Sequence, residues 1–257
     1  MDETRQSRWA GRSSAKSIVR GDVWGSLIAN EANVGPSFDC IPNFVGADMA
    51  AKRLSELDEW KSARVVKCNP DPPQIPVRLR ALYEGKLLFS PVPYLTKGLP
   101  YLRIDPDKLA AKGIDFETAA TAQGFMQHGE PVSFDDMPML DFCVVGCVAV
   151  TREGGRTGKG AGFADLEQGI FRELGKVTAK TPIATTVHTL QVVDAGQVVM
   201  ESHDSALNFI ATDLELIRTQ TRHPQPDGVD WSKVRADQFA DIPFLRAVRD
   251  SILARKG

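Results

Sequence analysis

Cysteine and histidine are scarce in this sequence, and neither occurs in a metal-binding pattern. The chain has four cysteines and four histidines among 257 residues. No two cysteines form a CxxC pair, and Cys143 and Cys147 lie inside an apolar run, where cysteine acts as a small hydrophobic side chain. We therefore expect neither a disulfide framework nor a zinc site, and we expect a reducing, cytoplasmic location.

Long apolar runs and an excess of one charge are also missing. The longest apolar run, residues 142–150, is too short to cross a bilayer, and the first residues lack the apolar stretch of a secretory signal. The formal net charge is −2, and the four tryptophans are scattered along the chain. We expect neither a membrane partner nor a nucleic-acid partner.

Signatures of two common hydrolase classes are weak or absent. The sequence has no Gly-x-Ser-x-Gly elbow, which disfavours a serine hydrolase. His203-Asp204 is an isolated pair without further histidines at metal-binding spacing, so a turn that hydrogen-bonds its own backbone is the better interpretation. His188, at a predicted strand end, is equally consistent with a site residue and with a structural histidine.

Apolar residues follow strand-like and helix-like spacing in alternation. Residues 1–12 are polar, so we expect a flexible N-terminus followed by a single α/β domain over residues 13–257. The predicted strands are residues 64–68, 86–91, 141–151, 182–187 and 208–212, the last extended through 214–217. The predicted helices are residues 13–32, 48–57, 77–84 and 163–174, with a terminal helix opening at 241–243.

This alternation predicts a three-layer α/β fold, an open, largely parallel sheet with helices on both faces. Residues 92–140 are rich in proline, glycine and aspartate and are predicted to be irregular, bordering the site or a partner. Arg64 and Lys67 are interpreted as solvated surface charges.

The glycine-rich loop at residues 154–162, GGRTGKGAG, carries the strongest chemical signal. It stands between a predicted strand and a predicted helix, where backbone N–H groups and the helix dipole favour an anion. Arg156 and Lys159 supply mobile positive charge, and Asp165 is a candidate for magnesium. The loop is neither a Walker A motif nor a GxGxxG motif, and a flexible surface turn is the alternative interpretation.

The loop resembles that of 5-formyltetrahydrofolate cyclo-ligases, whose pattern is G-x-R-L-G-Y-G-G-G-Y-Y-D-R. The matching residues are Arg156, Gly158, Gly160, Gly162 and Asp165. Downstream, the family pattern is similar at three places: Gln191 before a valine pair, the 203–204 turn, and the strand end at 209–213. Upstream, Lys16 and Arg20 resemble the basic first helix of the family.

The resemblance implies a cyclo-ligase fold of the NagB–RpiA–CoA transferase-like type, with ATP and Mg²⁺ as cofactors. Its reaction converts 5-formyltetrahydrofolate and ATP to 5,10-methenyltetrahydrofolate, ADP and phosphate. A nucleotide and a small molecule, a folate or another phosphorylated metabolite, would then be the partners. The implied catalytic residues are Arg156 and Lys159, and the implied metal ligand is Asp165. The implied nucleotide or phosphate contacts are Lys16, Arg20, Gly158, Gly160, Ala161 and Gly162. The implied substrate contacts are Phe44, Phe163 and Gln191.

Several positions depart from the family pattern. Phe163 and Ala164 replace its paired tyrosines, and its substrate-contacting glutamate has no clear match, the equivalent stretch being residues 43–48. Residues 69–78 resemble a cyclo-ligase-like paralogue branch that includes the methenyltetrahydrofolate synthase domain-containing proteins and is linked to thiamin metabolism. Three functions remain open: an ATP-dependent cyclo-ligase, a paralogue that acts on another phosphorylated metabolite, and a non-enzymatic ligand-binding protein.

Overall fold

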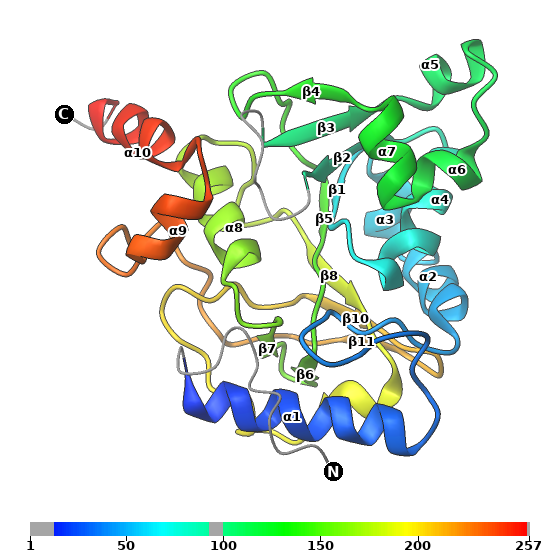
Figure 1. The fold of residues 1–257 in the computed structure, drawn as a ribbon, viewed down its shortest axis with the longest axis vertical. Coiled ribbons are helices and arrows are strands. Elements are labelled where there is room, and N and C mark those ends of the chain that lie inside the picture. Colours follow the sequence, from blue (N-terminus) through cyan, green and yellow to red (C-terminus); the bar gives the residue numbers. More distant parts are fainter. Residues whose placement is uncertain (1–12, 93–99, 256–257) are drawn as a thin grey trace.

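The computed structural model describes residues 13–92 and 100–255, so the predicted flexible N-terminus over 1–12 lies outside the described residues. An eight-stranded sheet forms the centre of the molecule, in the order β11-β10-β8-β5-β1-β2-β3-β4 (Figure 1). Its strands are β1 (Val65–Cys68), β2 (Leu87–Pro91), β3 (Tyr101–Ile104), β4 (Glu130–Val132), β5 (Phe142–Val144), β8 (Ile183–Thr186), β10 (Phe209–Ala211) and β11 (Leu216–Arg218).

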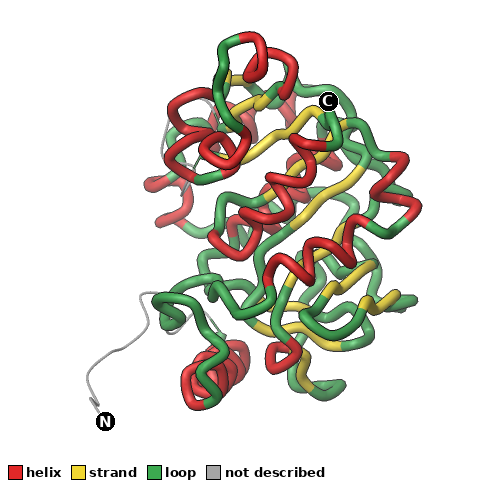
Figure 2. The backbone as a smooth tube through the Cα atoms, turned by 90° about the vertical axis from the view of Figure 1, so that its right-hand side faces the viewer, coloured by secondary structure: helices red, strands yellow, loops and turns green. Residues whose placement is uncertain are grey.

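The strand pairing confirms the predicted largely parallel sheet. Strands β10, β8, β5, β1 and β2 form a continuous parallel run. The strands β3 and β4 at one edge and β11 at the other pair antiparallel. In the rotated view of Figure 2, the strands, in yellow, lie between the helices, in red.

Helices cover both faces of this sheet, as predicted (Figure 1). One face packs against α2 (Ala47–Ser55), α3 (Asp58–Ser62), α4 (Ile75–Tyr83), α6 (Phe116–Ala120) and α7 (Ala122–His128). The other packs against α8 (Phe163–Glu173), α9 (Ala236–Asp241) and α10 (Leu245–Ala254). Successive strand residues point to opposite faces, so Val66 and Cys68 enter the first core while Lys67 points toward α8.

The apolar run over residues 141–151, predicted as one strand, is two strands in two sheets. β5 belongs to the large sheet, whereas β6 (Ala149–Thr151) joins a small sheet with β7 (Arg156–Thr157) and β9 (Val192–Val193). Gly146 lies at the crossing, where a Cβ atom would stand 2.8 Å from Asp71 Oδ2. The single-strand prediction was wrong because both halves are buried, and burial alone produces a continuous apolar run.

The helix α1 (Ser14–Ala29) lies across the small sheet (Figure 1). The Ser13 hydroxyl accepts from the Lys16 amide at its N-terminus and caps the helix. Its residues Val23, Trp24 and Leu27 share a buried cluster with Val148 and Ala149. This packing presents the first turns of α1 to the end of the glycine-rich loop.

The prediction of irregular structure over residues 92–140 was wrong for most of the described part. Besides β3, β4, α6 and α7, this region contains α5 (Pro106–Ala111). Side chains of Asp105, Asp115 and Thr121 cap the three short helices. These capping residues, together with proline and glycine, gave the segment the composition of a loop.

Two smaller elements also differ from the sequence prediction. Residues 214–217 do not extend the strand before them, because the Thr212 hydroxyl accepts from the Leu214 and Glu215 amides and turns the chain into the antiparallel β11. The segment after β1 contains a short 3₁₀ helix, η1 (Pro72–Gln74), and a second one, η3 (Thr189–Gln191), precedes β9. Among the described residues, no helix has the length and apolar character needed to span a bilayer.

Candidate functional site

A cavity of about 580 Å³ lies beyond the carboxyl ends of β1, β2 and β5. Asn69, Pro91 and Gly146, at or just after those strand ends, contribute to its wall. From β1 the chain first adds β2 on one side and later β5 on the other, so the strand order reverses at β1. Open α/β sheets bind ligands at such a reversal, which makes this cavity the candidate site.

The glycine-rich loop forms one wall of this cavity. Gly158, Lys159, Gly160, Ala161 and Gly162 all line it. Gly160 has φ 110° and Gly162 has φ 75°, backbone conformations that disfavour any other residue. Gly162 is the N-cap of α8, so the loop ends at the N-terminus of this helix, which lines the cavity.

The structure brings the predicted basic residues of α1 to the same cavity. Arg20 is buried and donates from Nη1 to Thr157 Oγ1 at 3.1 Å and to the Gly158 carbonyl at 3.5 Å. Burial lowers the pKa of Arg20. Lys16 forms an ion pair with Asp204, and Lys159 Nζ lies 3.9 Å from Asp71 Oδ1. Lys16, Arg20 and Lys159 therefore all line one cavity although α1 and the loop are far apart in sequence.

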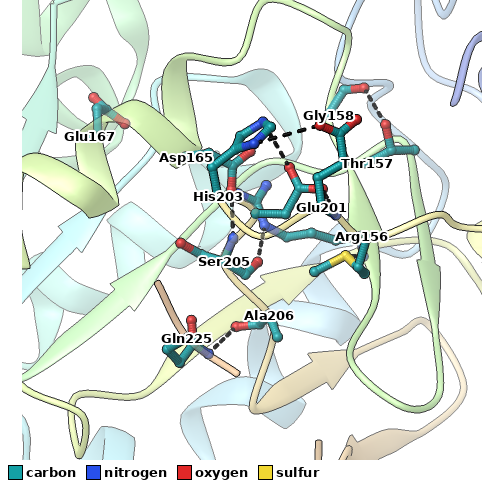
Figure 3. A network of polar contacts seen from close by, with 12 residues as sticks. Arg156, Thr157, Gly158, Asp165, Glu167, Glu201, His203, Ser205, Ala206 and Gln225 are labelled. Atoms are coloured by element: carbon teal, nitrogen blue, oxygen red, sulfur yellow. Dashed lines mark hydrogen bonds and ion pairs between the residues drawn. The ribbon is translucent and has the colours of Figure 1, made fainter. Parts of the chain in front are cut away.

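Arg156 was predicted to be a mobile charge, and this prediction was wrong. Its guanidinium is buried, donates from Nε to the Ser205 carbonyl at 2.7 Å and pairs with Asp165 (Figure 3). Burial alone would lower the pKa of Arg156, but Asp165 together with Cys147 and Asp204 outweighs it, so the pKa is raised. Arg156 borders the cavity as a fixed charge that ties the loop to α8 and to Ser205.

Asp165, the predicted metal ligand, is the partner that holds Arg156 in place. The same carboxylate oxygen also accepts from the Ser205 amide at 2.8 Å (Figure 3). Within the described residues, no group of three or more His, Cys, Asp or Glu side chains is arranged to hold a metal ion. Asp165 lines the cavity, but its carboxylate is already engaged by protein donors.

Of the three predicted substrate contacts, the structure places Phe163 on the cavity wall and the other two elsewhere. Gln191 is buried, donates to the Cys147 and Val148 carbonyls at 3.1 and 3.0 Å, and accepts from the His188 amide at 2.8 Å. Phe44 is buried with its ring edge against His188. His188 itself caps η3, so this group organises the turn before β9.

His203 stands at the cavity rim between two carboxylates. Its Nδ1 atom is 3.6 Å from Glu201 Oε2 (Figure 3). Its Nε2 atom is 3.7 Å from Asp204 Oδ1. Asp204 in turn accepts from the Glu201 amide at 2.8 Å, closing the backbone turn that the sequence predicted for this pair.

Comparison with known proteins identifies the family. The profile described as the 5-formyltetrahydrofolate cyclo-ligase family matches residues 12–213. The chain belongs to this family. Methenyltetrahydrofolate synthase domain-containing protein from Bos taurus is 38% identical over 237 residues, covering 91% of this chain and 62% of that protein. The Danio rerio protein of the same name is 40% identical over 233 residues, covering 90% and 60%.

This cyclo-ligase-family chain thus spans about three fifths of the length of those relatives. Among solved structures, the NMR structure of Aquifex aeolicus 5,10-methenyltetrahydrofolate synthetase matches 81% of this chain and 95% of its own. That match has a TM-score of 0.49 and 20% sequence identity.

The segment after β1 contributes to the cavity, whereas residues 43–48, the stretch equivalent to that of the family glutamate, are not among the lining residues. Asn69, Pro70, Asp71 and Pro72 line the cavity, and Asp71 places a carboxylate there. The buried Arg78 donates to the Asn69 carbonyl and, at 3.2 Å, to the Asp71 carbonyl, which holds this segment against the site. The four prolines over residues 69–76 indicated an ordered loop, but they did not reveal where it lies.

Sequence reasoning also missed a buried polar group beneath the cavity. Lys67, interpreted as a surface charge, is fully buried, and its Nζ atom lies 2.9 Å from Glu167 Oε2 on α8. The Tyr101 hydroxyl donates to Glu167 Oε1 at 2.6 Å. A lysine between Val66 and Cys68 in a buried central strand was the available signal, since such a position requires a partner.

Proposed function

We propose that this protein binds ATP through its phosphates at residues 158–162 and holds a second small molecule in the same cavity. The observation that carries the proposal is the convergence of the glycine-rich loop, the N-terminus of α8 and the side chains of Arg20, Lys16 and Lys159 on one cavity. Each of these features favours an anion, and together they match a phosphate chain.

Lys159 and Arg20 have different roles in this proposal. Lys159 lines the cavity opposite Asp71, at 3.9 Å, and its long flexible side chain brings an ammonium charge within reach of a bound phosphate. Arg20 is fixed by Thr157 and Gly158 and supports the loop while adding charge beneath it. Arg156, held by Asp165, keeps the start of the loop in place, which makes it a positioning residue.

Charge balance at the cavity favours binding of ATP together with Mg²⁺. Lys16, Arg156 and Lys159 each face a carboxylate, from Asp204, Asp165 and Asp71 respectively. A nucleotide polyphosphate therefore needs further positive charge, and Mg²⁺ characteristically binds through one or two carboxylates plus phosphate oxygens. Asp71 is suitably placed as such a carboxylate, and the ion, when bound, would neutralise charge on the transferred phosphoryl group.

The family reaction is one candidate for the chemistry that follows. In it, ATP activates the formyl oxygen of 5-formyltetrahydrofolate, and the methenyl product forms as phosphate leaves. This chain would supply phosphate binding from Lys159 and Arg20 and a cavity wall from Phe163.

A second candidate is favoured by Phe163 and Ala164, which replace the paired tyrosines of the family. A phenyl ring stacks but donates no hydrogen bond, and Ala164 leaves space for a ligand of another shape. In this function the protein keeps the phosphate site and acts on a different phosphorylated metabolite, such as one of thiamin metabolism, or only binds it.

A thermal-shift titration of the full chain with Mg-ATP tests the proposed binding. A ligand that binds only the folded state raises the unfolding temperature as its concentration rises above its dissociation constant. We expect a rise that saturates with Mg-ATP. A flat response from folded protein at millimolar-range nucleotide would contradict the proposal.

A further inference from the structure

Four hydrogen-bonded side chains at the cavity wall form a polar group, which we term the floor cluster: Lys67, Asn69, Tyr101 and Glu167. They come from β1, the segment after β1, β3 and α8. Asn69 and Glu167 line the cavity, whereas Lys67 and Tyr101 are fully buried behind them. The rise of an α-helix places Glu167 roughly 8 Å along α8 from the loop end at Gly162.

The two buried members hold the two cavity-lining members in fixed orientations. Lys67 donates to Glu167 Oε2 at 2.9 Å and also to Asn69 Oδ1. The Tyr101 hydroxyl donates to Glu167 Oε1 at 2.6 Å. Burial, and then the Glu167 charge, raise the pKa of Tyr101 well above its ordinary value, so its hydroxyl remains a donor.

This arrangement determines what the floor cluster offers to a ligand. Because the Asn69 oxygen faces the Lys67 ammonium, the Asn69 amide nitrogen is turned the other way, and no hydrogen bond among the described residues uses it. Each Glu167 oxygen accepts one bond from the protein and retains capacity for another. The cavity floor therefore presents an N–H donor beside a carboxylate acceptor.

We propose that Asn69 and Glu167 form a subsite for the edge of a nitrogen heterocycle that carries an N–H group beside a ring acceptor. The ring N–H or amino group would donate to Glu167, and the neighbouring carbonyl oxygen or ring nitrogen would accept from Asn69. A lactam edge and a 4-aminopyrimidine edge both have this pattern. The inference rests on the proposed function, since it names the side chains of the cavity wall that would hold the ring of the second small molecule.

A purely structural role is the competing explanation, in which the cluster only joins β1, β3 and α8. For stability alone, a buried ion pair brings little over packed apolar residues of the same size. The structural explanation also leaves the Asn69 amide without a use at the cavity surface. If the cluster binds a ring, substitutions in it should weaken binding of a ring ligand and leave phosphate binding unchanged. If the cluster is only structural, the same substitutions should not affect ring binding selectively.

The test measures dissociation constants by calorimetry for three probes with the full chain. 5-Formyltetrahydrofolate carries a lactam edge, thiamin monophosphate carries a 4-aminopyrimidine edge, and Mg-tripolyphosphate carries no ring. The variants are Asn69→Ser, which removes the amide donor without adding charge, and Glu167→Gln, which keeps the shape but weakens the acceptor. Asn33→Ser and Glu215→Gln make the same chemical changes outside the cavity.

We expect the wild type to bind at least one ring probe and both cavity variants to weaken that binding at least tenfold, about the loss of one charge-assisted hydrogen bond. Mg-tripolyphosphate affinity should stay within about twofold for all four variants, and the outside variants should bind every probe as the wild type does. The probe that responds identifies the ring class.

Three results would overturn the inference: a wild type that binds neither ring probe, cavity variants that bind the ring as tightly as the wild type, or variants that lose ring and Mg-tripolyphosphate affinity equally. The last result would indicate the structural role. A wild type that binds a ring probe but does not bind Mg-tripolyphosphate would instead contradict the proposed phosphate site. The two failures are therefore distinguishable.

Discussion

Lys159 is the residue whose removal separates phosphate binding from folding. Its Nζ atom lies 3.9 Å from Asp71, and its side chain lines the cavity, so the alanine variant enlarges that cavity without opening a void in an apolar core. We expect Lys159→Ala to weaken Mg-ATP binding by about 1.5–3 kcal/mol, the range for hydrogen bonds to charged groups. Calorimetric titration measures this change.

The matched control is Lys52→Ala, which removes an exposed lysine from α2 on another part of the molecule. It should bind Mg-ATP as the wild type does, and both variants should unfold at nearly the wild-type temperature. Equal Mg-ATP affinities in wild type and Lys159→Ala would remove Lys159 from the site.

Asp165, which the sequence predicts to bind magnesium, also allows a stability test of its contacts with Arg156 and Ser205. Asp165→Ala leaves the buried Arg156 guanidinium without its carboxylate and the Ser205 amide without an acceptor. We expect the free energy of unfolding to fall by about 3 kcal/mol, the lower end for breaking a buried pair, because Asp165 remains partly exposed. Urea unfolding measures it.

Asp237→Ala is the control for this change, because Asp237 pairs with Arg235 in an ion pair that is exposed on both sides. Its loss should cost less than about 1 kcal/mol. A comparable small loss for Asp165→Ala would show that Arg156 does not depend on Asp165.

At the scale of elements, Glu130 of β4 connects that edge strand to its neighbours. It accepts from Lys108 Nζ at 2.7 Å and from Arg103 Nε at 3.0 Å. These hydrogen bonds, that from Lys108 foremost, lower the pKa of Glu130 to about 2. The unfolded-state pKa of glutamate is about 4.3, so the stabilisation is complete above that pH and is lost as the pH falls toward 2.

We therefore expect Glu130→Gln to destabilise the protein slightly at pH 7, by less than about 1 kcal/mol because the group is solvent-exposed. The difference from the wild type should shrink as the pH is lowered from 5 to 2. Urea unfolding across that range measures the difference, and a gap that grows on acidification would contradict the assigned pKa.

The elements that the sequence predicted well are those with a strong period and a clear boundary. The helix α8, with an apolar stripe ending before Gly175, and α1, capped by Ser13, were located closely. The break at Gly146 was missed because burial on both sides hides a change of sheet. Lys67 was wrongly predicted to be a surface charge. Its partner Glu167 lies a hundred residues away in the sequence, and nothing in the local sequence around Lys67 reveals that pairing.

At the scale of the whole molecule, the family and the sheet architecture followed from one loop motif and the alternation of strands and helices. The cavity did not, because it is assembled from α1, the segment after β1, the loop before α8 and residues 201–204 and 228–235. Phe44 and Gln191 had been carried over from motif similarity, and the structure shows both in the interior beside His188. Long-range packing determines which residues meet, and local patterns do not contain it.

The cavity as a whole predicts poor turnover of 5-formyltetrahydrofolate. Orientation of reactants supplies several kcal/mol of a reaction barrier, and Phe163 with Ala164 removes the hydroxyl groups of the paired tyrosines of the family. We expect ATP binding with weak or absent formation of 5,10-methenyltetrahydrofolate. The absorbance of that product measures it, and robust ATP-dependent formation by pure protein would restore the family reaction as the function.

Hydrogen–deuterium exchange with and without Mg-ATP tests the central claim, phosphate binding at the glycine-rich loop, most directly. A bound phosphate chain slows exchange of the amides it contacts or orders. The account predicts slower exchange at residues 158–162 and at the first turns of α1 and α8, with α5 and α6 unchanged. Unchanged exchange at residues 158–162 under saturating Mg-ATP would contradict it.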